Sequence, residues 1–303
     1  MKHPIARFSF AGLLAVASPT FAADLNFSSV EGFGGLPLNV VETGKADGPA
    51  ILMIHGMAMG AMSFRPQLES DLAKDFRLVA FDLRGHGNSG KPWRGEDVQP
   101  SDVWADDVAA VIKTKKLKRP VILGWSYGGF VAADYIRKYG IKDIAALNLV
   151  GSIAGLVQQP PPVGNMTPED MKRRAAMQTS GNLFDNMTVV ESTVKIFEFP
   201  GMTPAYREEM RTLGIMLPAY VRKVFVGRNL DHQDVTPKLT LPVLITMGSN
   251  DVAQSPDAYA RLKAALPKAQ YSVFDGMGHL PFAQDSTRFN KDLAAFVNAA
   301  AKK

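Results

Sequence analysis

The sequence predicts an α/β protein whose mostly parallel central sheet is flanked by helices. Short apolar runs recur along the chain, and most are followed by a glycine-containing turn and then by a helical pattern. Continuous apolar runs are typical of strands buried on both faces, and strands that alternate with helices indicate a parallel sheet. The segments that we interpret as strands are residues 38–44, 50–54, 77–81, 121–125, 144–150, 243–247 and 271–274.

The segments between these runs have the composition and periodicity of helices. Residues 102–116 form an apolar stripe through Val103, Val108, Val111 and Ile112. Right-handed crossovers bring the carboxyl ends of parallel strands to one edge of the sheet, where ligands bind in open α/β sheets. The other predicted helices cover residues 63–75, 259–266, 288–301 and the segment after Ser126.

The alternation stops after Ser152, and three consecutive prolines at 160–162 mark a boundary. Residues 153–236 are rich in methionine and mainly helical in pattern. We therefore predict a core of residues 23–152 and 237–303, with residues 153–236 inserted as a helical cap before the strand that precedes Asp251. A chain of 303 residues with 46% hydrophobic and 21% charged residues suits this organisation.

The amino terminus has the pattern of a secretory signal peptide. Lys2 and Arg7 precede an apolar run at 8–17, and small residues follow it up to Ala22, where we place the cleavage site. The run is well short of the ~20 residues that a membrane span requires. We therefore expect removal of residues 1–22, export to the periplasm or the medium, and no stable membrane anchor.

Charge and cysteine content exclude several kinds of partner and site. The signal peptide carries two basic and no acidic residues, so its loss lowers the formal charge from +5 to +3. This weak excess does not argue for nucleic-acid binding, and the basic run at 113–119 is interpreted as a solvated helix end. Without cysteine the chain has neither disulfides nor thiolate metal sites.

The segment Gly124-Trp125-Ser126-Tyr127-Gly128 lies between a predicted strand and a predicted helix. The G-x-S-x-G pattern is typical of a sharp strand-to-helix turn that exposes the serine hydroxyl. Glycine is needed on both sides because a side chain would clash in so tight a turn. A flexible Gly/Ser loop is the alternative, but the strand before the motif and the helix after it favour the turn.

A serine hydroxyl needs a base to take its proton and an acid to orient that base. His279 follows the last predicted strand, and Asp251 follows the strand before it. The order serine, aspartate, histidine, each in a loop after a strand, is that of an α/β-hydrolase triad. Three alternatives stay open: Asp251 is a turn residue, Asp275 replaces it as the acid, or His279 is an ordinary loop histidine.

The remaining polar side chains near these turns are interpreted as structural. His55 and His86 are expected to hold turns near the site. Asp82 and Arg84 are expected to tie loops together beside it. His232, near the end of the insertion, is expected on the surface or in the packing of the cap.

Together these motifs resemble the α/β-hydrolase fold superfamily. The resemblance rests on His55-Gly56, residues 82–89, residues 124–129, Asp251 and Gly278-His279, and it covers nearly all of the mature chain except the insertion. It implies that Ser126 is the nucleophile, His279 the general base and then acid, and Asp251 the orienting carboxylate. It also implies an oxyanion hole made by the backbone N–H groups of Met57 and Tyr127.

Two departures from related enzymes narrow the expected activity. Relatives that resemble epoxide hydrolases and haloalkane dehalogenases have an aspartate nucleophile and usually a proline two residues after the His-Gly pair. This chain has Ser126 and Ala58 at those positions. Tyr206 and Tyr220 of the insertion should therefore not be read as epoxide-activating residues.

The expected substrate is a small to medium apolar ester or lactone, cleaved through an acyl-enzyme at Ser126. Methionines crowd the turn after His55, and the insertion adds aromatic residues, which suits an adaptable apolar pocket. The residues that we expect to bind substrate are Met57, Trp125, Phe184 and Phe197. Packing of the cap onto the sheet is the alternative role for each of them.

Several other functions share the same residues. A carbon–carbon bond hydrolase, an amidase or aminopeptidase, a cofactor-free perhydrolase or haloperoxidase, and a ligand-binding protein with little turnover all stay open. We expect no metal and no cofactor, because the histidines are scattered and no phosphate-binding glycine loop is present. The only expected partner is a small-molecule substrate.

Overall fold

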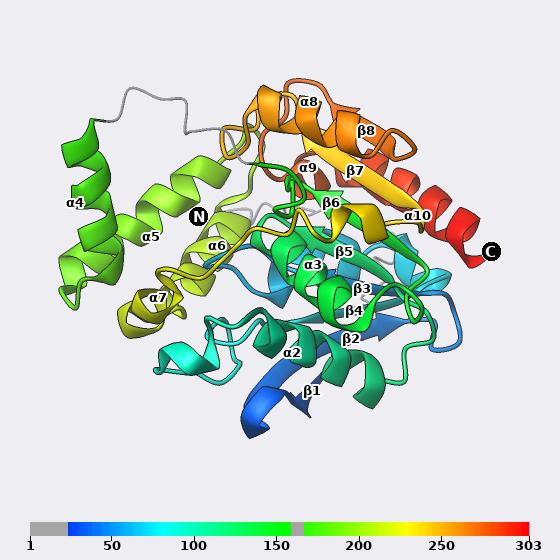
Figure 1. Cartoon of the computed structure of the whole chain (residues 1–303), viewed down its shortest axis with the longest axis horizontal. Coiled ribbons are helices and arrows are strands. Elements are labelled where there is room, and N and C mark those ends of the chain that lie inside the picture. Colours follow the sequence, from blue (N-terminus) through cyan, green and yellow to red (C-terminus); the bar gives the residue numbers. More distant parts are fainter. Residues whose placement is uncertain (1–23, 159–166, 303) are drawn as a thin grey trace, which may run out of the picture.

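The computed structural model describes residues 24–158 and 167–302, so the predicted signal peptide at 1–22 lies outside the described residues. An eight-stranded sheet forms the centre of the molecule (Figure 1). Its spatial order is β1-β2-β4-β3-β5-β6-β7-β8. The strands are β1 (Asn26–Glu31), β2 (Pro37–Gly44), β3 (Ala50–Ile54), β4 (Arg77–Phe81), β5 (Val121–Trp125), β6 (Ala146–Val150), β7 (Val243–Gly248) and β8 (Gln270–Phe274).

The predicted fold class is confirmed. Strands β3 to β8 pair in parallel, whereas β2 pairs with β1 and β4 antiparallel. Strands β3, β4 and β5 begin and end at the predicted residues, and all five residues of β3 and of β5 are buried. Strand β1 was not predicted, because an edge strand with the sequence NFSSVE is mostly exposed and has no apolar run.

Helices cover both faces of the sheet. Apolar residues of α2, α3 and α8 pack in one core cluster, and those of α1, α9 and α10 pack in the other. The helices outside the insertion are α1 (Arg65–Leu68), α2 (Ser101–Thr114), α3 (Tyr127–Tyr139), α8 (Pro256–Ala265), α9 (Pro281–Gln284) and α10 (Ser286–Ala301).

The helix predicted at 63–75 is replaced by three short pieces. A 3-10 turn at Ala61–Phe64 leads into α1, and a second 3-10 turn covers Asp71–Lys74. The Ser70 hydroxyl accepts a hydrogen bond from the Leu72 N–H at 3.2 Å and so caps a new turn. Such local bonds compete with a continuous helix.

The described residues between β6 and β7 form four α-helices: α4 (Pro168–Thr179), α5 (Leu183–Phe197), α6 (Pro204–Ile215) and α7 (Ala219–Phe225). They stand to one side of the sheet (Figure 1). The two ends of this insertion are joined, because the His232 N–H donates to the Gly155 carbonyl at 2.9 Å. The Thr236 hydroxyl donates to the Leu156 carbonyl at 2.5 Å.

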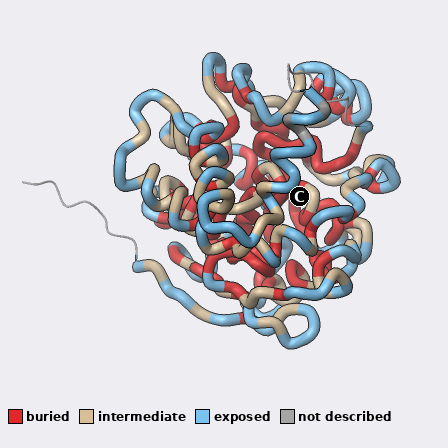
Figure 2. Tube along the Cα trace, turned by 90° about the vertical axis from the view of Figure 1, so that its left-hand side faces the viewer, coloured by how far each residue is buried: buried red, intermediate tan, exposed pale blue. Residues whose placement is uncertain are grey.

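The helices of the insertion differ in how firmly they pack. Helix α5 buries Val190 and Val194, and α6 buries Met210 and Leu213. Helix α4 buries none of its described side chains. In the molecule as a whole, Figure 2 shows buried residues in the interior and exposed residues on the outer segments. In the described parts of the chain, no helix is both long enough and apolar enough to span a membrane.

Candidate active site

Ser126 lies at a sharp turn between β5 and α3. Its backbone angles are φ 53° and ψ −117°, which place a residue other than glycine in the left-handed half of φ/ψ space. Conformations of this kind persist where the surrounding structure imposes them. Ser126 is also the one residue between Val121 and Gly129 that is not buried. The turn therefore presents the hydroxyl away from the core.

The glycines of the motif are required by close backbone approach. A Cβ on Gly124 would lie 2.7 Å from the carbonyl oxygen of Gly128, and a Cβ on Gly128 would collide with the carbonyl oxygen of Ile54 in β3. The first turn of α3 is thus pressed against two strands. This contact holds the start of the helix, with its free N–H groups, directly after Ser126.

Asp251 and His279 meet in the loops after β7 and β8. His279 Nδ1 lies 2.9 Å from both carboxylate oxygens of Asp251, and both side chains are buried. Among the described residues, His279 Nε2 has no hydrogen-bond partner. A carboxylate at Nδ1 leaves Nε2 of the neutral ring as a proton acceptor.

Backbone contacts bring the His279 loop to the serine turn. The Trp125 indole N–H donates to the His279 carbonyl at 3.0 Å. The Ser126 N–H donates to the Val150 carbonyl at 2.9 Å, and a Cβ on the next residue, Gly151, would lie 3.0 Å from His279 Nδ1. Among the described residues the Ser126 hydroxyl itself makes no hydrogen bond with the imidazole. Such bonds are often long without substrate and tighten when it binds.

The backbone at Met57 is oriented by His55. The Leu83 N–H donates to His55 Nε2 at 2.9 Å, so the ring proton is on Nδ1, which lies 2.7 Å from the Gly56 carbonyl. Burial lowers the pKa of His55 to about 4, so the ring is neutral at pH 7. Because the peptide is planar and trans, fixing the Gly56 carbonyl turns the Met57 N–H the opposite way. Among the described residues that N–H has no partner.

Asp82 and Arg84 join loops beside the site, as predicted. Asp82 accepts hydrogen bonds from the N–H groups of Ala61 at 2.7 Å and Asn88 at 2.8 Å. Arg84 forms a fully buried ion pair with Asp107 of α2 at 2.7 Å. Asp82 thus ties the loop after β3 to the loop after β4.

The structure decides between the two locations predicted for His232, the surface and the packing of the cap. Its side chain is fully buried against α3, where Nε2 lies 2.7 Å from Asp134 Oδ1, so a surface position is wrong. Arg228 is paired with the same carboxylate and donates to the Tyr127 hydroxyl at 2.5 Å. Its guanidinium also stacks over Trp104 and Tyr127.

Sequence reasoning missed this cluster around Tyr127. Burial raises the pKa of Tyr127 to about 12, so its hydroxyl stays protonated. The only available signal was Asp134, an acidic residue on a helix face that is otherwise buried and apolar. Its partners lie 94 and 98 residues further along the chain, and no motif connects them.

The expected substrate-binding residues separate into different locations. Phe197 stacks on His279 with ring centroids 5.6 Å apart, and Met57 is partly exposed. Trp125 is fully buried, and its ring centroid lies 5.8 Å from that of His279, so its side chain packs against the imidazole. Phe184 is 82% exposed at the start of α5. Asp275 is exposed, and Asp251 occupies the position beside His279.

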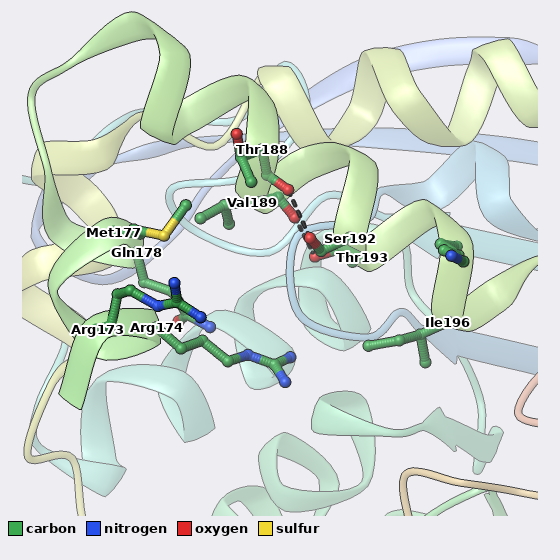
Figure 3. Close-up of a pocket in the computed structure, with 10 residues that line it drawn as sticks. Arg173, Arg174, Met177, Gln178, Thr188, Val189, Ser192, Thr193 and Ile196 are labelled. Carbon is green, nitrogen blue, oxygen red and sulfur yellow. Dashed lines mark hydrogen bonds between the residues drawn. The ribbon is translucent and has the colours of Figure 1, made fainter. Parts of the chain in front are cut away.

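A pocket of about 710 Å³ lies between α4 and α5 (Figure 3). Of the methionines expected to form an apolar pocket, only Met177 lines it. Its wall along α5 reaches Ile196, the residue before Phe197.

Comparison with known proteins assigns the family. The alpha/beta hydrolase fold family matches residues 49–286, most of the chain. The chain belongs to this family. The protein is thus a hydrolase, as the sequence motifs predict. Its resemblance extends beyond the motifs, because the match covers strands β3 to β8, the serine turn and the loops that carry Asp251 and His279.

Three relatives show how far the similarity extends. The AB hydrolase superfamily protein YisY of Bacillus subtilis is 27% identical over 83% of this chain and 92% of its own length. The bifunctional esterase/perhydrolase DCH of Acinetobacter calcoaceticus is 26% identical over 88% of this chain and 97% of its own. A crystal structure of a putative aryl esterase from Burkholderia cenocepacia superposes with a TM-score of 0.83 and 26% identity, covering 92% and 100% of the two chains.

Proposed function

We propose that the protein is a serine esterase that cleaves carboxylic esters through an acyl-enzyme at Ser126. The observation that carries this proposal is the partly exposed serine at a strained turn, next to a loop in which Asp251 holds His279 by Nδ1. Two relatives that cover this chain almost fully are named as esterases. The same elements are those that nucleophilic catalysis by serine needs.

In the proposed reaction His279 Nε2 takes the proton of the Ser126 hydroxyl while Oγ forms a bond to the ester carbonyl carbon. The tetrahedral oxyanion accepts hydrogen bonds from the N–H groups of Met57 and Tyr127. One such donor contributes on the order of 3 kcal/mol of transition-state stabilisation. Collapse breaks the carbon–oxygen bond, and the alcohol leaves with the proton from His279. Water then attacks the acyl-enzyme by the same route, and Ser126 and the free acid result.

The substrate that we propose is an ester or lactone with an apolar acyl group. Phe197 covers the face of His279, and Met57 offers partly exposed apolar surface at the turn after β3. A series of p-nitrophenyl esters with increasing acyl length tests this preference. An apolar site requires kcat/KM to rise with chain length up to the size of the site, and a preference for acetate over every longer ester would contradict it.

Labelling with a fluorophosphonate tests the nucleophile directly. We expect stoichiometric modification of Ser126 with loss of p-nitrophenyl ester hydrolysis. The Ser126→Ala variant should lose both the label and more than about 10⁴-fold in kcat, because the nucleophile is removed. Ser152→Ala is the matched control, since its hydroxyl donates to the Ser126 carbonyl at 2.7 Å and is not a nucleophile. Labelling that survives in Ser126→Ala would refute the proposal.

Perhydrolysis is a second candidate, favoured by the name of the Acinetobacter relative. Hydrogen peroxide would replace water as the attacking group on the acyl-enzyme, giving a peracid and free Ser126. Assaying peracid formation from an acetate ester with hydrogen peroxide tests it, and Ser126→Ala should abolish that activity as well.

A further inference from the structure

The pocket between α4 and α5 has an apolar floor and a cationic rim. Met177, Val189 and Ile196 supply apolar side chains to its wall. Its volume of about 710 Å³ lies within the range typical of small-molecule sites, roughly 300–1,000 Å³. Figure 3 shows Arg174 of α4 and Ile196 of α5 extending toward the same space. We call this pocket the α4–α5 groove.

The charged residues that line the described part of the α4–α5 groove are all basic. Arg173, Arg174 and Lys195 line it, and none of the ten lining residues is acidic. Among the described residues, neither Arg174 nor Lys195 has a carboxylate partner. Of the two acidic residues of α5, Glu191 pairs with Arg207 and Arg211 of α6, and Asp185 accepts a hydrogen bond from the Ser180 hydroxyl.

The hydroxyl groups of the groove do not offer protons to a ligand. Ser192 donates to the Thr188 carbonyl at 2.7 Å, and Thr193 donates to the Val189 carbonyl at 2.9 Å. The free donors are therefore mainly the cationic groups of Arg174 and Lys195. An apolar floor with such donors is complementary to an apolar chain that ends in an anion.

Helix α5 connects the groove to the proposed catalytic residues. Ile196 lines the groove, and the next residue, Phe197, stacks on the imidazole of His279 at 5.6 Å with an interplanar angle of 12°. Consecutive Cα atoms are only about 3.8 Å apart. Ile196 and Phe197 are thus adjacent positions of α5, one in the groove and the other against the imidazole.

We propose that the α4–α5 groove binds the far end of the substrate, and that this end is a carboxylate on an apolar chain. The proposal rests on the proposed esterase function of Ser126 and specifies the substrate class. Arg174 and Lys195 would pair with the carboxylate, while Met177, Val189 and Ile196 contact the chain. The ester near His279 remains in apolar surroundings.

Matched ester series test this substrate class. Monoesters of p-nitrophenol with dicarboxylic acids from succinic to sebacic acid are compared with p-nitrophenyl esters of monocarboxylic acids of equal length. We expect the free carboxylate to lower KM about tenfold for the longer chains and to have no effect for succinate, the shortest acid of the series. The double variant Arg174→Gln/Lys195→Gln should abolish this advantage.

Lys172→Gln is the matched control, because Lys172 is an exposed cation of α4 that does not line the groove. It removes a positive charge from the same helix and should leave the carboxylate advantage intact. An equal loss of the carboxylate advantage in Lys172→Gln would show general attraction by a positive surface and would overturn the proposal. The proposal would also be overturned if the free carboxylate lowered KM at no chain length.

Binding without turnover separates this proposal from the esterase proposal. Calorimetry of monomethyl sebacate with the Ser126→Ala variant measures the groove alone, and the double variant should raise Kd about tenfold. If neutral esters are hydrolysed through Ser126 but binding is unchanged by the double variant, only the groove proposal fails. If no ester is hydrolysed but binding weakens as expected, only the esterase proposal fails.

Discussion

The molecule contains two buried Asp–His pairs, and they differ at the second ring nitrogen. His279 contacts Asp251 through Nδ1, and Nε2 has no partner among the described residues. His232 contacts Asp134 through Nε2 at 2.7 Å, and its Nδ1 lies 3.1 Å from the Leu230 carbonyl. Only the first ring has a nitrogen free to exchange a proton with a substrate. Proximity of an aspartate and a histidine therefore does not identify a catalytic base.

The carboxylates of these two pairs, Asp134 and Asp251, also differ in their other partners. Asp134 is paired with Arg228 and accepts a hydrogen bond from the Ser101 hydroxyl, so its charge is already compensated. Asp251 accepts one backbone hydrogen bond, from Ala253 at 2.8 Å, and is otherwise directed at His279. Its charge stays available to stabilise an imidazolium that forms during a reaction. The pair of Asp134 and His232 instead fixes the C-terminal end of the insertion to α3.

Substitution of the two histidines provides the strongest test of this difference. His279→Gln should lower kcat about 10⁴-fold or more with little change in thermal stability, because it removes the base while keeping a polar side chain. His232→Gln should lower the unfolding temperature and leave kcat, per folded molecule, within a few fold. Ester kinetics and thermal unfolding of both variants measure the two effects.

The comparison fails if both variants lose activity equally while both remain folded. Circular dichroism of each variant at the assay temperature confirms folding before rates are compared. A large kcat loss in folded His232→Gln would mean that the Asp134 cluster acts on the reaction through Tyr127.

Arg228 gives the next largest effect, on stability. Arg228→Met should lower the free energy of unfolding by about 3–5 kcal/mol, because Asp134 is left buried beside an uncharged side chain. Urea unfolding measures this loss. Arg65→Met is the matched control, because the pair between Arg65 and Glu209 is partly exposed and should contribute much less. Equal losses of unfolding free energy in the two variants would mean that the buried pair of Arg228 and Asp134 contributes no more to stability than the partly exposed pair.

His55 and His86, which have no carboxylate partner among the described residues, predict acid sensitivity. Burial lowers the pKa of His55 to about 4 and, with a smaller effect of His55, that of His86 to about 3. Below the unfolded pKa of about 6.5 the unfolded chain therefore binds more protons, so stability falls as pH decreases from 6.5 toward 4. The expected loss from His55 is about 3 kcal/mol across this range.

Urea unfolding between pH 7.5 and 4.5 measures this slope. His86→Phe removes one titrating group and keeps a ring next to Phe225, on which His86 stacks at 5.6 Å, so the slope should be shallower. An identical slope in the variant would show that other groups cause the acid sensitivity.

The sequence was most informative where burial on both faces imposes a continuous apolar run. Strands β3 and β4 were predicted to the residue for this reason. Strand β1 escaped prediction because pairing at the sheet edge depends on β2 and not on its own apolar residues. The short helical pieces near Ser70 escaped because a single side-chain cap outweighs helix periodicity.

The site was predictable in its motifs and not in its surroundings. Ser126, Asp251 and His279 were predicted to lie together because each follows a strand, and the topology brings strand ends to one edge. Phe184 and Phe197 have the same chemistry, but they lie about three and a half turns apart on α5 and point in different directions. Only the packing of α5 decides which of them reaches His279. The same holds for Arg228, whose partner Asp134 is remote in sequence.

The joined ends of the insertion have a consequence for how such enzymes can diversify. Because the His232 N–H meets the Gly155 carbonyl, the intervening chain leaves the sheet and returns to it at nearly one point. Segments whose ends lie close together are tolerant of replacement. Residues 156–231 could thus be replaced by a different insertion. Substrate specificity would then change while the sheet and the residues at its carboxyl edge stay the same.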